Sequence, residues 1–188
     1  TNVVLIEAND VQFGQLQRRL GTRTGWRLCN QVIAHETGTV TYYEANNPAE
    51  SGLVEPETLR GLWPNLQTMQ KQSREAVSLM DLLKDSDPAP NWLLIDCLPA
   101  LPLIKGLASL TNVDVVVGRM LLQEREQAGQ ASLAALQNTL EGHGFRLISN
   151  QISRHPALGH ALFFRDNEAR LRALQERHAK LTASFQRE

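Results

Sequence analysis

Two acidic residues stand where an apolar run gives way to a loop, and this position suggests ligand binding. Glu7 closes the run VVLIE (residues 3–7), and Asp96 follows the run NWLLI (residues 91–95). In open α/β sheets, ligands bind beyond the carboxyl ends of the strands. A carboxylate placed there can accept hydrogen bonds from the two hydroxyl groups of a ribose, or it can cap the helix that follows. Both roles are open for each of the two acids.

The histidines and cysteines give weaker indications of catalysis. His155 and His160 are five residues apart across a proline and a glycine, a spacing that suits neither one helix face nor a zinc pair. Cys29 and Cys97 both fall in strand-like runs, and we predict that they are buried free thiols in a reducing compartment. No base stands beside Cys97 in the sequence, so a cysteine nucleophile is not predicted.

Strand-like and helix-like segments alternate along the chain, as they do in an α/β fold. The runs at residues 3–6 and 115–117 are continuously apolar, which is how strands read when helices cover both faces of a sheet. Apolar residues at helical spacing, such as Leu133, Leu136 and Leu140, follow the second of these runs. We therefore predict a three-layer α/β fold around a mainly parallel sheet.

The first half of the chain also contains a predicted hairpin and a long polar segment. Residues 26–33 and 38–44 read as strands joined by a short polar turn, which favours a hairpin. Residues 45–73 are polar and contain proline, so we predict a surface excursion with one short helix near residues 56–61. Residues 74–79 then read as an edge strand.

Composition and charge argue against several classes of protein. The 188 residues are 42% hydrophobic and carry a formal net charge of −1, without the basic excess of a general nucleic-acid-binding face. No stretch approaches the roughly 18 apolar residues that a membrane helix needs, and no signal peptide is visible. The sequence thus predicts a cytoplasmic protein with neither a nucleic-acid nor a membrane partner.

The last segment has a pattern of its own. Apolar residues and one histidine follow each other at intervals of three and four, like the a and d positions of a heptad: Leu171, Leu174, His178, Leu181 and Phe185. We predict an α/β domain over residues 1–166 and an amphipathic helix over residues 167–188. This helix either docks on its own domain or begins a coiled coil, through which the chain would self-associate or continue.

The order of several short motifs resembles the FkbM-type family of S-adenosylmethionine-dependent methyltransferases. The matching segments are, in chain order, VVLIEAND, FGQLQRRL, CNQVIAHETGTVTYY, ESGLVE, SLMDLL, LLIDCLPALPLIKG and LAALQNTLEGHGFRLI. The likeness covers roughly residues 2–150. It implies a Rossmann-like class I methyltransferase fold. It also implies transfer of a methyl group from S-adenosylmethionine to a hydroxyl of a small molecule or glycan.

The resemblance assigns roles to individual residues. It implies that Glu7 holds the ribose hydroxyls of the cofactor and that Val32, Ile33 and His35 lie beside the adenine. Ser51 would belong to a loop over the substrate. Asp96 would lie at the methyl-transfer site, where it is the candidate base for the acceptor hydroxyl.

The chain also departs from the family pattern. The first strand and glycine-rich loop of the family would precede residue 1, and Asp-Val-Glu-Gly-Ala-Glu of the family reads DCLPAL here, at residues 96–101. We therefore expect a fragment or a degenerate copy that binds S-adenosylmethionine weakly or not at all, since backbone N–H groups of such a loop hold the ligand. The alternative is a non-catalytic methyltransferase-like module for domain or subunit association.

Overall fold

The computed structural model describes residues 2–107, 110–122, 131–168, 171–172 and 175–176. The chain divides into two compact units, one built from residues 1–89 and 97–108 and the other from residues 90–96 and 109–188. It therefore passes from one unit to the other three times.

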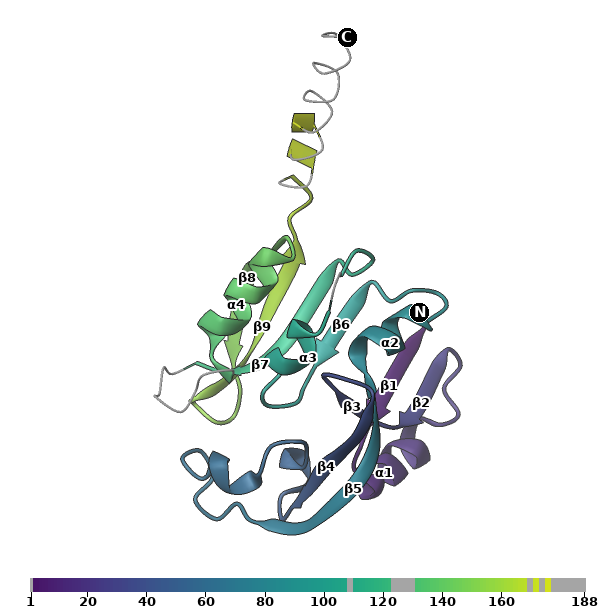
Figure 1. The fold of residues 1–188 in the computed structure, drawn as a ribbon, viewed down its shortest axis with the longest axis vertical. Helices are drawn as coiled ribbons and strands as arrows, with labels where there is room; N and C mark the ends of the chain where they lie inside the picture. The colour runs from purple at the N-terminus through teal and green to yellow at the C-terminus, as the bar shows by residue number, and fades with distance from the viewer. Residues whose placement is uncertain (1, 108–109, 123–130, 169–170, 173–174, 177–188) are drawn as a thin grey trace. The chain divides into compact units, whose positions relative to one another are not determined.

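The first unit contains a two-stranded and a three-stranded sheet, labelled in Figure 1. Its elements are, in chain order, β1 (Val3–Glu7), α1 (Asp10–Leu20), β2 (Trp26–Asn30), β3 (Val32–Ala34), β4 (Gly38–Ala45), the 3-10 helices η1 (Pro48–Glu50) and η2 (Pro56–Leu59), β5 (Thr68–Ser78), α2 (Leu79–Lys84) and α3 (Leu101–Lys105). Strands β1 and β2 are parallel and are connected through α1. Strand β5 is central in the other sheet, parallel to β3 and antiparallel to β4.

Local capping explains where α1 begins and ends. The Asn9 side chain accepts a hydrogen bond from the Gln12 amide at 3.0 Å, and Asp10 places a negative charge in the first turn. Gly21 follows the last helical residue, and its amide donates to the Gln17 carbonyl at 2.9 Å. Asn9 and Gly21 thus mark the two ends of the helix.

The second unit is built on one four-stranded sheet. Its elements are β6 (Trp92–Ile95), β7 (Val115–Leu121), α4 (Leu133–Gly142), β8 (Phe145–Ile152) and β9 (Leu158–Arg165). The strands lie in the order β6-β7-β9-β8, with β6 parallel to β7 and β9 antiparallel to both of its neighbours. Strands β6, β7 and β8 therefore run in one direction, and β9 runs against them.

The two faces of this sheet differ in burial. Helix α4 covers one face so closely that a Cβ atom added at Gly118 of β7 would lie 2.8 Å from Leu136 Cδ2. Phe163 of β9 is on the same face as Gly118 and is fully buried. On the opposite face, Trp92, Leu94 and other apolar side chains are exposed. We call this second face the exposed apolar face.

The α/β class is confirmed, but the arrangement of strands differs from the prediction. Among the described residues, three strand pairings are parallel and three are antiparallel, and they form three sheets instead of one mainly parallel sheet. The predicted hairpin of residues 26–33 and 38–44 is wrong. Strand β2 pairs with β1, whereas β3 and β4 both pair with β5. The edge strand predicted over residues 74–79 is wrong as well: residues 74–78 belong to this central strand, which pairs on both sides, and Leu79 begins α2.

The C-terminal helix is only partly within the described residues. Leu171 is helical and exposed, whereas Leu174, His178, Leu181 and Phe185 lie outside the described part of the chain. The association role of this helix therefore stays a prediction. No helix in the described ranges has the length and apolar composition needed to cross a membrane.

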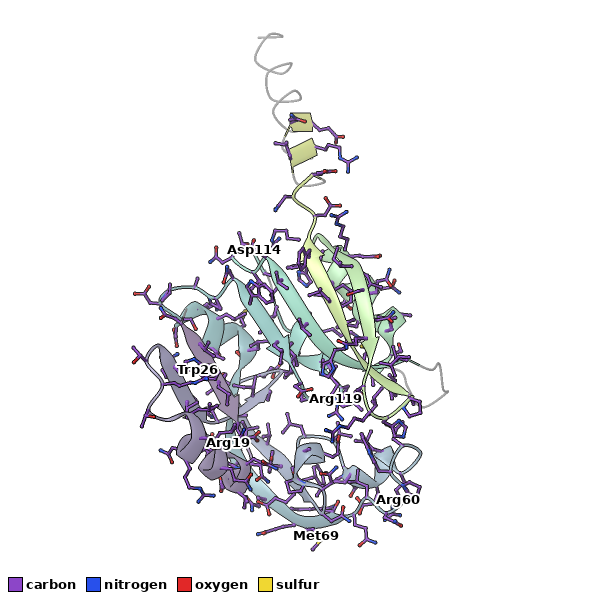
Figure 2. The ribbon with its side chains drawn as sticks, turned by 180° about the vertical axis from the view of Figure 1, so that it is seen from behind. Arg19, Trp26, Arg60, Met69, Asp114 and Arg119 are labelled. Atoms are coloured by element: carbon purple, nitrogen blue, oxygen red, sulfur yellow. The ribbon has the colours of Figure 1, made fainter. Side chains whose placement is uncertain are left out.

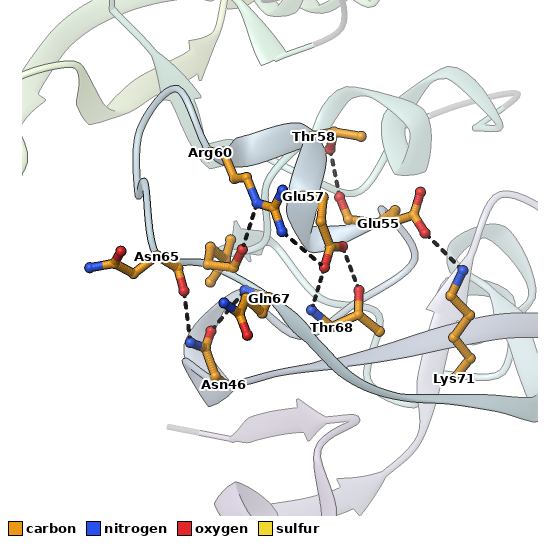
Figure 3. A network of polar contacts seen from close by, with 10 residues as sticks. Asn46, Glu55, Glu57, Thr58, Arg60, Asn65, Gln67, Thr68 and Lys71 are labelled. Atoms are coloured by element: carbon orange, nitrogen blue, oxygen red, sulfur yellow. Dashed lines mark hydrogen bonds and ion pairs between the residues drawn. The ribbon is translucent and has the colours of Figure 1, made fainter.

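A polar network fixes the long excursion between β4 and β5 (Figure 3). Glu57 of η2 accepts two hydrogen bonds from Thr68, one from its amide at 2.8 Å and one from its hydroxyl at 2.6 Å. Arg60 lies 3.7 Å from the Glu57 carboxylate and donates to the Leu66 carbonyl at 3.1 Å. The predicted short helix near residues 56–61 is confirmed, and its carboxylate ties the excursion to the first residue of β5.

This network predicts a pH-dependent contribution to stability. The Thr68 hydroxyl and amide lower the pKa of Glu57 to about 2 from 4.5. A carboxylate whose pKa is depressed in the folded state stabilises that state above its unfolded pKa, and the contribution is lost as pH falls through the folded pKa. We expect Glu57→Gln to lower the melting temperature at pH 7, and the difference from the parent chain to shrink between pH 4.5 and pH 2.

Thermal unfolding by circular dichroism at several pH values measures this difference. Glu36→Gln is the control, because the Glu36 side chain is almost fully exposed and should leave the melting temperature unchanged. A Glu57→Gln deficit that is as large at pH 2 as at pH 7 would contradict the assigned role of the Glu57 charge.

Candidate functional site

The two acids singled out in the sequence both lie at carboxyl ends of strands that have a parallel neighbour. Glu7 is the last residue of β1, which pairs with β2, and Asp96 follows the last residue of β6, which pairs with β7. The acids belong to different units. That they share one pocket therefore stays a prediction, and each has its own surroundings.

The backbone that follows β1 holds the Glu7 carboxylate in place. Glu7 Oε1 accepts a hydrogen bond from the Asn9 amide at 2.7 Å, and Asn9, which is buried, caps α1. Among the described residues, none donates a hydrogen bond to Glu7 Oε2. This arrangement leaves an ordered carboxylate oxygen at the strand end, which can accept a hydrogen bond from a ligand hydroxyl.

Arg74 of β5 joins the ends of β1 and β2 to the three-stranded sheet. Its guanidinium donates to the Ala8 carbonyl at 2.5 Å and contacts Asp10 Oδ1 at 3.3 Å and Asn30 Oδ1 at 3.5 Å. The Asn30 amide also donates to Asp10 Oδ1 at 2.7 Å. Arg74 lies over the Tyr42 ring, 5.2 Å from its centroid. The polar ends of β1 and β2 are therefore held by one cation.

Tyr42 lies close to Glu7 but is not suited to accept a proton. Burial raises the pKa of Tyr42 to about 12, and the negative charge of Glu7 adds to the increase while Arg74 opposes it. The phenol therefore keeps its proton across the physiological range. Its ring belongs to the apolar cluster of the three-stranded sheet, with Val32 and Ala34.

The residues predicted to lie beside an adenine have different surroundings. Val32 is fully buried in the apolar cluster, so its side chain is part of the core. Ile33 is half-buried, and His35 is exposed. His35 Nδ1 lies 3.2 Å from the Pro102 carbonyl, and a Cβ atom added at Gly106 would meet the same ring at 2.7 Å. Of the three predicted side chains, Ile33 and His35 are the two with surface available to a ligand.

Ser51, predicted to lie in a loop over the substrate, is engaged in a local contact. It follows η1, and its hydroxyl accepts a hydrogen bond from the Ala45 amide at 3.0 Å. This contact closes the turn between β4 and η1. A role in substrate binding stays a prediction for this residue.

In the second unit, Asp96 forms a pair with a histidine. Asp96 Oδ1 lies 2.8 Å from His160 Nε2 of β9. The strand register explains the contact: Ile95 of β6 pairs with Gly118 of β7, and the next residue of β7, Arg119, pairs with His160. Asp96 and His160 thus reach toward each other across β7, at the level of Arg119, which is labelled in Figure 2. We call these two residues the Asp96–His160 pair.

The pair was missed by the sequence analysis because the two residues are 64 positions apart. The spacing of His160 from His155 carries no information about it, since the partner is supplied by a strand pairing. The only indication in the sequence is that His160 and Asp96 each belong to a strand-like run. Asp96 and His160 can be recognised as neighbours only once β9 is known to pair with β7.

The prediction of two buried thiols is wrong, because neither cysteine is fully buried. Cys29 of β2 is half-buried, but Cys97 is exposed. Cys97 Sγ lies 3.9 Å from the Pro99 carbonyl oxygen. Both cysteines are free thiols.

No group of three or more His, Cys, Asp or Glu side chains suited to holding a metal ion occurs within the described ranges. Comparison with protein-family models, curated proteins and solved structures found no match to this chain.

Proposed function

We propose that the chain is part of an S-adenosylmethionine-dependent methyltransferase that acts on a hydroxyl group of a small molecule or glycan. The order of motifs over residues 2–150 supports this proposal. The strand directions support it as well, because β1 and β2 are parallel and β6, β7 and β8 run in one direction. Such directions are typical of Rossmann-like sheets, in which the ligand lies beyond the carboxyl ends of the strands.

The observation that carries the proposal is the Glu7 carboxylate at the end of β1. A carboxylate after a strand of a strand–helix–strand unit is the group that holds ribose hydroxyls in dinucleotide-binding folds. Here the Asn9 amide fixes one carboxylate oxygen, and the second has no donor among the described residues. A carboxylate with one unoccupied acceptor oxygen fits a ribose diol, whose hydroxyls donate to it. When bound, S-adenosylmethionine supplies an activated methyl group, while Glu7 binds and orients the nucleoside part.

The second candidate function is a non-catalytic module for domain or subunit association. The exposed apolar face of the second unit favours it, since Trp92, Leu94 and Phe164 are exposed there and exposed apolar side chains can mark interaction sites. This module would keep the methyltransferase-like fold without binding the cofactor.

Titration with S-adenosylmethionine, followed through backbone amide NMR signals, separates the two candidates even if binding is weak. We expect the signals of Asn9 and Asn30, at the ends of β1 and β2, to shift with ligand concentration. Glu7→Gln should weaken binding about tenfold, because a hydrogen bond to a charged group contributes roughly 1.5–3 kcal/mol. Glu36→Gln serves as the control and should bind like the parent chain. Equal titration curves for the parent chain and Glu7→Gln, or no shifts at all, would favour the association module.

A further inference from the structure

Strand β8 leaves one side of its backbone without a partner strand. It is the last strand in the order β6-β7-β9-β8 and pairs with β9 on its inner side. Among the described residues, no strand or isolated bridge pairs with its other side. An edge strand presents a row of N–H and C=O groups that can pair with another extended chain. We call this open side the outer edge of β8.

The outer edge of β8 has few of the features that keep sheet edges from pairing. Those features are charged side chains, prolines, bulges and short strands. Strand β8 has eight residues, no proline and one charged residue, Arg146, near its start. Its register with β9 shifts at Ile148, the extra residue of a β-bulge, and is regular from there to the end of the strand. Residues 148–152 are therefore the uncharged, regular part of the edge that is open to a further strand.

Residues 148–152 have the same order of apolar and polar side chains in both directions. Their sequence is ISNQI, with an isoleucine at each end and three uncharged polar residues between. Ile148 is 44% exposed and Ile152 is 64% exposed, and the polar residues between them are exposed as well. Side chains alternate along a strand, so the two isoleucines and Asn150 lie on one face. The segment is therefore complementary to an antiparallel copy of itself.

We propose that a second copy of this chain binds at the outer edge of β8, with the two β8 strands antiparallel and a two-fold axis at Asn150. In this register, Ile148 lies opposite the partner subunit's Ile152, and Asn150 lies opposite its own counterpart. Each isoleucine then meets an apolar side chain, and such cross-strand pairs stabilise a sheet. The Asn150 amide has both donors and an acceptor, so the two copies can hydrogen-bond to each other. Each contact off the axis occurs twice, as in isologous dimers.

The neighbouring registers are less favourable. Moving the two-fold axis by one residue toward the start of β8 places Ile152 opposite Arg146. Moving it by one residue toward the end places Ile148 opposite Arg154, which follows the strand. In both shifted registers, the other isoleucine lies opposite Asn150. With the axis at Asn150, the two arginines are level with each other just past the ISNQI segment, and like charges there limit the pairing to that segment.

A single pair of short strands makes a small interface. Stable, specific interfaces bury at least about 1,200 Å² in total, and smaller ones belong to weak or transient complexes. We therefore expect a dimer that forms at high protein concentration and dissociates on dilution. All of the pairing residues belong to the second unit, so the dimer does not depend on the cofactor site proposed at Glu7.

Sedimentation equilibrium of the full chain tests for this dimer over a concentration series that reaches the high micromolar range. We expect the mean mass to rise from that of the monomer toward that of the dimer. Ile148→Lys/Ile152→Lys places like charges opposite each other twice and should stay monomeric throughout. Leu94→Lys is the control, because Leu94 is also an exposed apolar residue, at 68%, but lies on β6. It should dimerise like the parent chain.

A charge swap at the same two positions tests the register. Ile148→Glu/Ile152→Lys places a glutamate opposite a lysine twice across the two-fold axis, so we expect it to dimerise, and more tightly at low salt. Because this variant also carries two charges on the edge, its dimer would show that the double-lysine variant fails through repulsion and not through misfolding.

Three results would overturn the proposed dimer. One is a parent chain that stays monomeric over the whole series, and another is a dimer that survives Ile148→Lys/Ile152→Lys. The third is loss of the dimer in Leu94→Lys, because the contact would then lie on the exposed apolar face. A charge-swap variant that stays monomeric beside a dimeric parent chain overturns the antiparallel register at Asn150.

Discussion

Phe163→Ala should lower the free energy of unfolding by about 3–5 kcal/mol, the range for removing a buried aromatic ring from a packed core. Phe163 has an exposed fraction of 0%, on the face of the second-unit sheet that α4 covers. Its removal leaves a cavity that the neighbouring strands cannot close without breaking their register. Urea unfolding followed by circular dichroism measures this loss of stability, which should lower the urea concentration at the midpoint of unfolding.

The adjacent residue provides the control for this prediction. Phe164 precedes the end of β9 and points to the exposed apolar face, with 39% of its surface exposed. We expect Phe164→Ala to cost less than about 1 kcal/mol, as most surface substitutions do. Similar losses for the two variants would mean that the α4 side of the sheet is not the core of this unit.

Arg74→Met should be the most damaging single change in the first unit outside its apolar cluster. Methionine keeps the apolar length of the side chain but removes the donors to Ala8, Asp10 and Asn30 and the contact with Tyr42. Arg74 is only 19% exposed, so the groups that lose this cation are partly shielded from water. Hydrogen bonds to charged groups contribute roughly 1.5–3 kcal/mol, and we expect a total loss of about 2–3 kcal/mol.

Urea unfolding again measures this loss, with Arg27→Met as the control. Arg27 is exposed on β2 and should tolerate methionine with a change of less than about 0.5 kcal/mol. The NMR signals of Asn9 and Asn30 should also broaden or move in Arg74→Met, because the ends of β1 and β2 lose their shared partner. An unchanged midpoint together with unchanged signals would show that the cation is not needed there.

Local chemistry made parts of this fold predictable from the sequence. The ends of α1 follow from Asn9 and Gly21, and Ser78 opens α2 by accepting a hydrogen bond from the Asp81 amide. The positions of Glu7 and Asp96 at strand ends follow from the apolar runs before them. In each of these cases, residues close in sequence determine the outcome.

The predictions from the sequence fail where the paired strands are distant in the sequence. Strand β5 has mostly polar side chains because much of its surface is exposed, so its N-terminal half reads as a loop. Its alternation of exposed and half-buried positions becomes visible only when β4 is placed beside it. The Asp96–His160 pair was missed for the same reason, since a neighbouring strand brings the histidine to the acid.

The path of the chain between the two units has a consequence for synthesis on the ribosome. Residues 1–89 emerge first, but the first unit is incomplete without α3, whose Ile104 is fully buried and whose Pro102 carbonyl lies beside His35. Strand β6 of the second unit emerges before α3. Its pairing partner β7 emerges about twenty residues later. Domains usually fold in the order in which they leave the ribosome. Here the first unit cannot finish before the second has begun, so the first unit of the nascent chain should resist proteases only after residues 97–108 have emerged.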